Sequence, residues 1–209
     1  DGFGVVVQAY GKRAGQIIDW LYALATRLDR KIMVRLVKGA YWDSEIKRAQ
    51  IAGRPDYPVF TTKAATDLSY LACAQRLTAA APALFPQFAT HNAHSLAAVR
   101  HMAAQAGVAI EYQRLHGMGE ALYAAADVGA VRAYAPVGGH EELLPYLVRR
   151  LLEDGADSSF VHALLDPEVP AGAVARDPIA IVAAAPHRHP RIPLPRDIYG
   201  ADRINPPGR

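Results

Sequence analysis

The hydrophobic pattern of the chain alternates between two periods. Short runs rich in β-branched residues recur along the sequence, and between them apolar residues return every three or four positions, as on one face of a helix. The strands are expected at residues 5–9, 31–38, 87–90, 108–113 and 130–135. The helices are expected at residues 16–28, 43–52, 61–80, 95–106, 119–126 and 140–153, the second of them opened by an Asp-Ser cap at Asp43. Because helix follows strand each time, the pattern predicts parallel βα units.

Polar side chains near the ends of the predicted strands distinguish two parallel architectures. A doubly wound sheet collects its ligand groups at one crevice, whereas a (β/α)8 barrel collects them from the carboxyl ends of several strands. Gln8, His91, Gln113 and Tyr134 follow or close four different strands, and no GxGxxG motif follows the first one. The sequence therefore predicts an α/β fold in which residues 1–165 form the C-terminal portion of a (β/α)8 TIM-like barrel, with about five of the eight βα units.

Residues 166–209 have a different composition from the rest of the chain. Nine of the 15 prolines lie between Pro167 and Pro207, and the stretch around Arg188 is basic. Such a segment cannot build a core of its own and is typical of an extended linker or docking segment, with simple disorder as the alternative. We expect a Pro-rich linker here.

Composition narrows the class of protein. A hydrophobic content of 51% and a charged content of 21% are ordinary for a globular chain. The net charge of +3 comes without a lysine-arginine block, so no nucleic-acid contact is expected from this segment. No apolar run approaches the roughly 20 residues of a membrane span. The start at Asp1, without methionine or signal peptide, predicts a piece of a longer protein, and the single Cys73 excludes an internal disulfide.

A basic helix face near the end of the predicted barrel is a candidate anion clamp. Tyr146 and Arg150 are four residues apart, as are Arg149 and Glu153, so each pair shares a face of the helix. Two guanidiniums beside a tyrosine can grip a small carboxylate through bidentate hydrogen bonds. A solvated basic turn on a surface helix is the alternative.

Other candidate residues are ambiguous when each is considered alone. Arg35 and Lys38 could be exposed charges at a strand end, and Tyr134 could be a core tyrosine. His91 and His94 could suggest a metal, but no third or fourth ligand has suitable spacing, so no metal site is expected.

Longer motifs resolve this ambiguity through a family resemblance. Their order along the chain is VRLVKGAYWD at 34–43, THN at 90–92, EYQRLHGMG at 111–119, YAPVG at 134–138 and YLVRR at 146–150. In this order they closely resemble the proline dehydrogenase domain of the bifunctional proline utilisation A flavoenzymes, from Gln8 to about Phe160. Residues 193–200 resemble the segment that enters the second enzyme of those proteins, the glutamate-semialdehyde dehydrogenase.

The resemblance implies an activity and its partners. The family's barrel binds FAD noncovalently and oxidises L-proline to 1-pyrroline-5-carboxylate, in the catabolism of proline to glutamate, with electrons passed to quinone. NAD is implied only for the dehydrogenase domain beyond this chain. The parent protein is expected to be a cytoplasmic homo-oligomer, with peripheral membrane association possible. The isolated segment is expected to be inactive, because the family's earlier strands supply a lysine and an aspartate to the pocket.

The resemblance also implies roles for individual residues. The residues implied in catalysis are Arg35, Tyr134, Arg149 and Arg150, with Arg35 near flavin N5 and the Arg149–Arg150 pair on the substrate carboxylate. The residues implied in shaping the substrate pocket are Leu36, Tyr41, Tyr134 and Tyr146. The residues implied in binding FAD are Gln8, Arg35, Val37, Lys38, Gly39, Ala40, Trp42, Thr61, Thr62, Lys63, Thr90, His91, Asn92, Gln113, Glu153 and Phe160.

Two other classes of protein remain as alternatives to this reading. Another flavin-binding or phosphate-binding barrel enzyme would share the glycine-rich strand ends, but it would not need paired arginines beside Tyr146. A non-catalytic fragment would tolerate the loss of Arg35.

Overall fold

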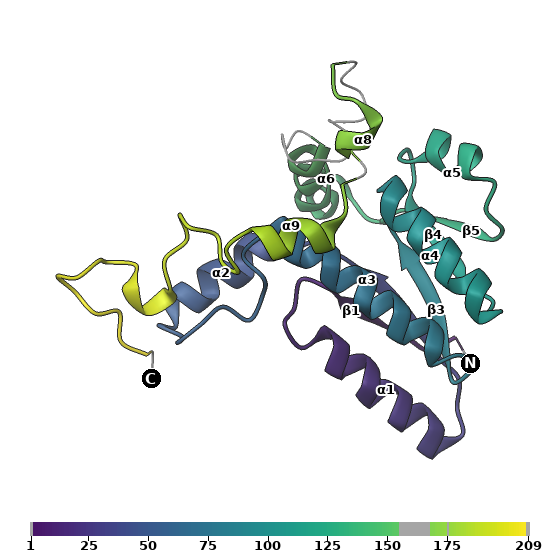
Figure 1. Cartoon of the computed structure of the whole chain (residues 1–209), viewed down its shortest axis with the longest axis horizontal. Coiled ribbons are helices and arrows are strands. Elements are labelled where there is room, and N and C mark those ends of the chain that lie inside the picture. Colours follow the sequence, from purple (N-terminus) through teal and green to yellow (C-terminus); the bar gives the residue numbers. More distant parts are fainter. Residues whose placement is uncertain (1, 155–167, 175, 208–209) are drawn as a thin grey trace.

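The computed structural model describes residues 2–154, 168–174 and 176–207, and Figure 1 shows their arrangement. The strands are β1 (Gly4–Gln8), β2 (Ile32–Val37), β3 (Leu84–Ala89), β4 (Glu111–Leu115) and β5 (Val131–Tyr134). The longer helices are α1 (Ala14–Leu28), α2 (Trp42–Ile51), α3 (Lys63–Ala79), α4 (Ala93–Ala106), α5 (Glu120–Ala126) and α6 (His140–Asp154). The tail adds α8 (Ala171–Val174), α9 (Pro178–Ala184) and the 3₁₀ turn η1 (Pro195–Asp197).

The five strands form one parallel sheet whose spatial order follows the sequence, β1-β2-β3-β4-β5. The register aligns Val7 with Leu36, Leu36 with Phe88, and Phe88 with Tyr112. Each connection between neighbouring strands contains at least one helix, as parallel pairing requires. The predicted order of βα units is therefore confirmed.

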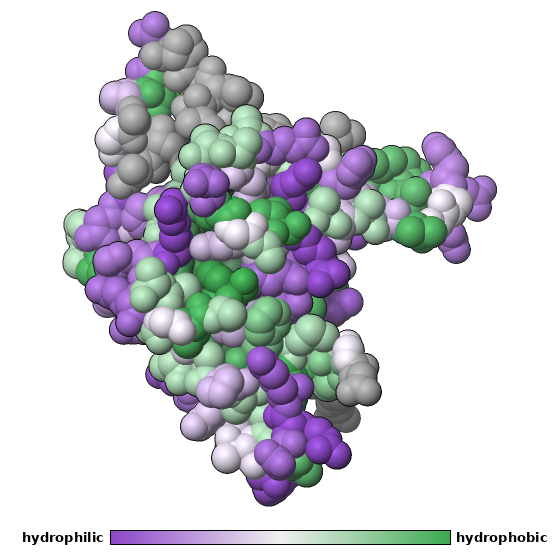
Figure 2. Space-filling model, turned by 90° about the vertical axis from the view of Figure 1, so that its right-hand side faces the viewer, coloured by the Kyte–Doolittle hydropathy of each residue, from purple (hydrophilic) through white to green (hydrophobic). Residues whose placement is uncertain are grey.

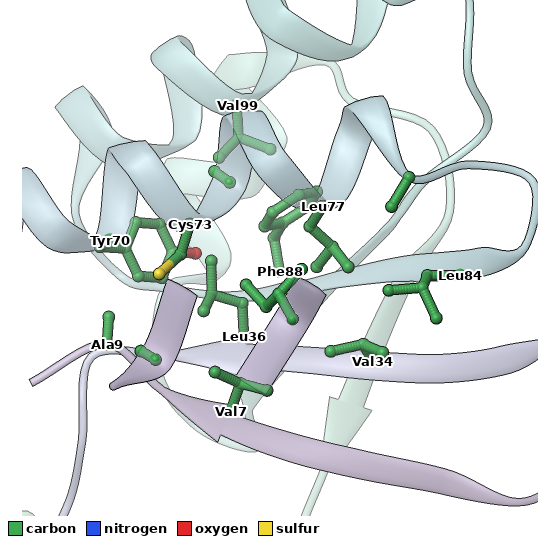
Figure 3. Close-up of a cluster of buried hydrophobic side chains, with 14 of the residues drawn as sticks. Val7, Ala9, Val34, Leu36, Tyr70, Cys73, Leu77, Leu84, Phe88 and Val99 are labelled. Carbon is green, nitrogen blue, oxygen red and sulfur yellow. The ribbon is translucent and has the colours of Figure 1, made fainter. Parts of the chain in front are cut away.

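The main hydrophobic core lies between one face of the sheet and the helices α1, α3 and α4, which lie side by side over it (Figure 1). Figure 3 shows Tyr70, Cys73 and Leu77 of α3 pointing toward Leu36 and Phe88 of the strands. These side chains are buried, and removing this much apolar surface from water is the main stabilising contribution. Cys73 is a buried core residue of α3.

The opposite face of the sheet, which we call the polar face, carries most of the charged and amide side chains of the five strands. Because side chains alternate along a strand, Arg35 lies opposite the core residues Val34 and Leu36. The register places Arg35 beside Gln87 and Gln87 beside Glu111. One pleat further along, it places Gln8 beside Val37, Ala89 beside Gln113, and Gln113 beside Arg132. The polar face is thus built in layers across the strands.

Most element boundaries differ from the sequence prediction by one to three residues, and three of these differences have an evident local setting. β4 begins at Glu111 rather than at residue 108, because the amide of Val108 donates to Ala103 O and closes the α4 terminus at Gly107, whose φ is +64°. β3 begins three residues early, and its Pro86, a residue that argues against a central strand, is tolerated within it. α2 begins at Trp42 without a side-chain cap, and Asp43 lies in its first turn.

The tail docks on the βα units instead of extending away from them. α9 packs against α3, and η1 contacts α2 (Figure 1). The Tyr57 hydroxyl donates to Pro193 O at 2.7 Å, and the Asn205 amide donates to Gln50 O and Pro195 O, both at 2.7 Å. The described part of the tail is therefore held to the βα units by hydrogen bonds of Tyr57 and Asn205.

Candidate functional site

The carboxyl ends of the parallel strands bring most of the predicted site residues to one edge of the sheet. Gln8 and Val37 end β1 and β2, and Tyr134 ends β5. Loops that begin at the same edge carry Lys38 and Thr90. In parallel α/β folds this edge is where ligands bind, because the strand ends and the loops that follow them converge there.

Arg35 and Tyr134 meet on the polar face. The guanidinium carbon of Arg35 lies 4.2 Å from the centre of the Tyr134 ring, a cation–π distance. Arg35 Nε is buried and has no hydrogen-bond partner among the described residues. A buried donor of this kind is costly unless a ligand or water satisfies it. The geometry therefore leaves one charged donor unpaired beside an aromatic ring.

Arg149 of α6 reaches the loop that follows β2. Its guanidinium carbon lies 5.3 Å from the centre of the Tyr41 ring, and its Nε is buried without a partner within the described chain. Tyr146 lies one turn earlier on the same helix. The side chains of Arg150 and Glu153 lie outside the described part of α6, and Phe160 lies outside the described residues altogether.

Lys38 belongs to a charge cluster that the sequence interpretation only partly identified. Its ammonium group forms an ion pair with Asp67, and Lys63 Nζ lies 2.8 Å from the second carboxylate oxygen of Asp67. Burial lowers the pKa of Lys38 against the opposing attraction of Asp67. Burial alone would raise the pKa of Asp67, but the two ammonium groups hold it below its ordinary value. One carboxylate thus holds two cations at the start of α3.

The loop after β2 depends on a glycine at Gly39. Its φ is +137°, a region that L-residues rarely adopt, and a Cβ there would lie 2.6 Å from the Tyr10 ring. The amide of Ala40 donates to Gln8 Oε1 at 3.3 Å. Gln8 is therefore in direct contact with the backbone of this loop.

The segment before α3 is anchored by its neighbours. Trp42 Nε1 donates to Phe60 O at 2.8 Å, and Thr62 caps α3 by accepting from the amide of Ala65. Thr61 Oγ1 accepts from the backbone amide of His189 at 3.1 Å. The tail therefore contacts a residue that is predicted to bind the cofactor.

The loop after β3 is fixed by its own hydrogen bonds. Asn92 caps α4 by accepting from the amide of Ser95 at 2.9 Å, and Thr90 Oγ1 accepts from the amide of Asn92. His91 Nε2 accepts from the amide of Leu115 at 3.1 Å, which is a role for an unprotonated nitrogen. The described residues contain no group of three or more side chains that could hold a metal ion.

A buried carboxylate at Glu111 was not singled out from the sequence. Glu111 Oε1 accepts from Gln87 Nε2 at 2.9 Å and from Gln113 Nε2 at 2.7 Å, and Arg132 binds both of its oxygens. The hydrogen bonds from Arg132 hold the pKa of Glu111 below its ordinary value, against the opposing effect of burial. The signal in the sequence was the alternation Glu111-Tyr112-Gln113, which places two polar side chains on one face of a strand.

Leu36 is not brought to this group of residues. It is fully buried against the helices, on the opposite side of β2 from Arg35, because consecutive side chains of a strand point to opposite faces. Leu115, which shares the polar face with Gln113, is also buried and pairs in register with Tyr134. An apolar wall beside Tyr134 is therefore supplied by Leu115, whereas Leu36 packs the core.

The remaining surface shows a second, apolar feature away from this edge. A hollow of about 520 Å³ lies between α4 and α5, and Leu96, Arg100 and Leu122 are among the residues that line it. Figure 2 shows the side of the molecule that carries these helices, with hydrophobic residues near its centre between hydrophilic ones. Across the described residues, no helix has both the length and the apolar character needed to cross a membrane.

Comparison with known proteins places this geometry in context. Residues 1–163 match the proline dehydrogenase family. The bifunctional protein PutA of Salmonella typhimurium is 52% identical over 226 residues, covering 100% of this chain and 17% of that protein. The PutA protein of Rhizobium meliloti is 52% identical over 225 residues, covering 100% of this chain and 18% of that protein.

Solved structures that resemble this chain belong to the same group of proteins. A crystal structure of a point mutant of Bradyrhizobium japonicum proline utilization A superposes with a TM-score of 0.89 at 56% identity, over 98% of this chain and 21% of that one. The chain therefore spans about a fifth of the length of these proteins or less. Its five-stranded parallel sheet has a TIM-barrel-like arrangement, as the sequence predicted.

Proposed function

Since this chain belongs to the proline dehydrogenase family of oxidoreductases, we propose that it forms part of an FAD-dependent enzyme that oxidises L-proline to 1-pyrroline-5-carboxylate. Residues 1–165 are the C-terminal part of the catalytic barrel in this proposal. Residues 166–209 lead into an aldehyde dehydrogenase domain, which alone uses NAD. Two observations support the division: the family match ends at residue 163, and the bifunctional relatives match the whole chain.

The observation that carries the proposal is the unpaired Nε of Arg35 on the polar face. A guanidinium half-buried beside Tyr134 has a donor available for a bound group that can accept a hydrogen bond and carry negative charge. A flavin ring system has both properties, and members of this family are generally flavin-dependent. The residues present at this edge therefore fit FAD.

Other residues at the same edge would hold the remainder of the cofactor. Lys38 and Lys63 supply two ammonium groups for the diphosphate, and the backbone around Gly39 allows a close approach. The further residues proposed to contact FAD are Gln8, Val37, Ala40, Trp42, Thr61, Thr62, Thr90, His91, Asn92 and Gln113, together with Glu153 and Phe160, whose side chains the structure does not describe.

The substrate carboxylate is assigned to the arginines of α6. Arg149 has a buried, unpaired Nε, and its guanidinium carbon lies 5.3 Å from the centre of the Tyr41 ring, so a charged donor is available for a carboxylate. Arg150 completes the clamp in this proposal. Tyr146, together with Leu115 and the Tyr134 ring, would orient the pyrrolidine ring of L-proline.

The chemistry needs few groups beyond these. When FAD is bound, it supplies the acceptor for the hydride that leaves the carbon next to the proline nitrogen. The arginines hold the carboxylate, and the aromatic side chains exclude water and fix the ring plane. Arg35 stabilises negative charge that develops on the acceptor, because a preorganised cation in a partly desolvated site costs no reorganisation.

The experiment that tests this proposal is anaerobic bleaching of the flavin absorbance by L-proline in the full-length protein. Loss of the absorbance band of the oxidised flavin on addition of L-proline is the expected result. A flavin spectrum that L-proline leaves unchanged would favour a different flavin enzyme of the same fold. The absence of any flavin spectrum would favour a non-catalytic fragment.

The partners of the whole protein follow from the same proposal. Electrons pass from the flavin to a quinone, which implies peripheral membrane association of a cytoplasmic protein, and the protein assembles as a homo-oligomer. Steady-state assays with a soluble quinone analogue test the first point, and light scattering tests the last.

A further inference from the structure

Glu111 is a buried carboxylate at the centre of a polar cluster that the proposed chemistry does not use directly. It lies on β4, and its neighbours in register and on the next pleat are Gln87, Gln113 and Arg132. It accepts from Gln87 Nε2 at 2.9 Å, from Gln113 Nε2 at 2.7 Å, and from Arg132 Nε and Nη2 at 3.0 and 2.7 Å. The Glu111 carboxylate therefore accepts all four of these hydrogen bonds.

The charge of Glu111 determines how the neighbouring amides point. Its pKa is held below the ordinary value, chiefly by hydrogen bonds from Arg132, so the group is ionised at neutral pH. An ionised carboxylate accepts hydrogen bonds and donates none, so an amide beside it must turn its NH2 group toward it. The carboxamide oxygens of Gln87 and Gln113 are therefore directed away from Glu111.

For Gln113 this orientation has a consequence at the cofactor site. Gln113 is buried on the polar face. It lies in the same layer across the strands as Gln8 and Val37, near the carboxyl ends of the strands. Its only side-chain hydrogen bond among the described residues is the one that its Nε2 makes to Glu111. Gln113 Oε1 consequently remains available as an acceptor.

We propose that Glu111 is a positioning residue of the cofactor site, which locks the Gln113 carboxamide so that its oxygen accepts from an N–H group of bound FAD. This inference rests on the proposed function, since it assumes that FAD occupies the polar face. Arg132 balances the charge of Glu111, so the carboxylate orients Gln113 without adding an uncompensated negative charge near the flavin.

The test uses Glu111→Gln in the full-length protein, with FAD affinity measured by titrating the apoprotein and following flavin fluorescence. The variant keeps the side-chain shape but removes the charge, so Gln113 can rotate and present either end. We expect the dissociation constant for FAD to rise by up to about tenfold, the upper end of what one neutral hydrogen bond contributes. An unchanged dissociation constant would overturn the inference.

A double-mutant cycle separates positioning from a general structural effect. If Glu111 acts through Gln113, Glu111→Gln should not weaken FAD binding further in a Gln113→Ala background, even though it lowers the thermal midpoint in both backgrounds. Additive losses of FAD affinity would show that Glu111 acts by another route and would reject the inference. If Glu111→Gln does not fold, Glu111→Asp, which keeps the charge with a shorter reach, takes its place in the cycle.

Gln87→Met is the matched control. Gln87 donates to the same carboxylate oxygen at 2.9 Å, so its loss disturbs the cluster without touching Gln113. We expect a lower thermal midpoint with an FAD dissociation constant close to that of the wild type; an equal loss of affinity would argue that the cluster is only structural. A wild-type protein that binds no FAD would refute the proposed function itself, whereas normal FAD binding and proline bleaching in Glu111→Gln would refute only the role of Glu111.

Discussion

At the scale of single residues, the polar face combines a charged guanidinium, an aromatic ring and an unpaired buried nitrogen at Arg35 and Tyr134. An unpaired buried donor lowers the stability of the fold by about 1–3 kcal/mol, so this position of Arg35 is unfavourable for stability alone. The simplest explanation is that binding of a ligand supplies the missing acceptor.

Arg35→Met in the full-length protein should slow reduction of the flavin by L-proline and lower the flavin potential, while FAD stays largely bound. Preorganised donors of this kind contribute about 3–4 kcal/mol to the transition state. Anaerobic stopped-flow bleaching, normalised to bound FAD, measures the rate. A normal rate together with lower thermal stability would instead assign Arg35 a purely structural role.

Asp67 should contribute an acid-sensitive part of the stability. Its pKa in the folded protein lies below the ordinary 3.8, so the stability from its ion pairs is present above that value and is lost as the pH falls through the folded pKa. Thermal midpoints measured between pH 7 and about pH 3 should fall less steeply for Asp67→Asn than for the wild type. Parallel curves for the two proteins would contradict this expectation.

At the scale of elements, α3 is the helix on which the core depends. Tyr70, Cys73 and Leu77 insert between the strands and the neighbouring helices (Figure 3), and the N-terminal end of α3 carries the Lys63–Asp67 pair of the candidate site. Packing of this helix and the geometry of the cation cluster are therefore linked through one rigid element.

Leu77→Ala should lower the free energy of unfolding by about 2–5 kcal/mol, because a fully buried leucine is replaced by a cavity that closely packed neighbours cannot fill. Chemical denaturation measures the change. Ile51→Ala is the control: Ile51 is 74% exposed, and the expected effect is within about 0.5 kcal/mol. Similar losses in both variants would place Leu77 outside the cooperative core.

At the scale of the whole molecule, the two edges of the sheet and the tail differ in whether their backbone groups have partners. Within the described residues β1 pairs only with β2, and β5 only with β4. Parallel sheets are normally buried, and an unpaired strand edge is a site for association. The described part of the tail, by contrast, forms hydrogen bonds with α2 and with the segment that precedes α3.

The isolated 209-residue chain should therefore be unable to bind FAD and oxidise L-proline. Both sheet edges would need partners that the five βα units do not provide. Expression of this chain alone, followed by gel filtration and a flavin spectrum, measures the outcome. A monodisperse, flavin-loaded and active product would contradict the prediction.

Asn205→Ala should detach the end of the tail. The amide of Asn205 bridges Gln50 O and Pro195 O, and a buried carbonyl that loses its donor costs about 1–3 kcal/mol. Hydrogen exchange of residues 195–205 should become faster, whereas Ile204→Ala, at a side chain that is 78% exposed, should leave it unchanged. Unaltered exchange in Asn205→Ala would mean that other contacts hold the tail.

Much of this protein was determined by its sequence alone. The alternation of hydrophobic periods predicted the order of the βα units and the parallel sheet, because burial of a strand or of a helix face leaves a local signature. The motifs around Arg35, His91 and Tyr134 identified the edge at which chemistry is expected. The period of two along β2 also implies that Leu36 and Arg35 face opposite sides, although the family resemblance had grouped them.

Only the tertiary structure decided which distant residues become partners. The pairing of Lys38 with Asp67, the convergence of Gln87, Gln113 and Arg132 on Glu111, and the docking of the tail all join segments from different βα units. A local pattern can show that a side chain is polar and on which face of its strand it lies. Its partner is fixed by strand register and by helix packing, which depend on contacts between residues far apart in the chain.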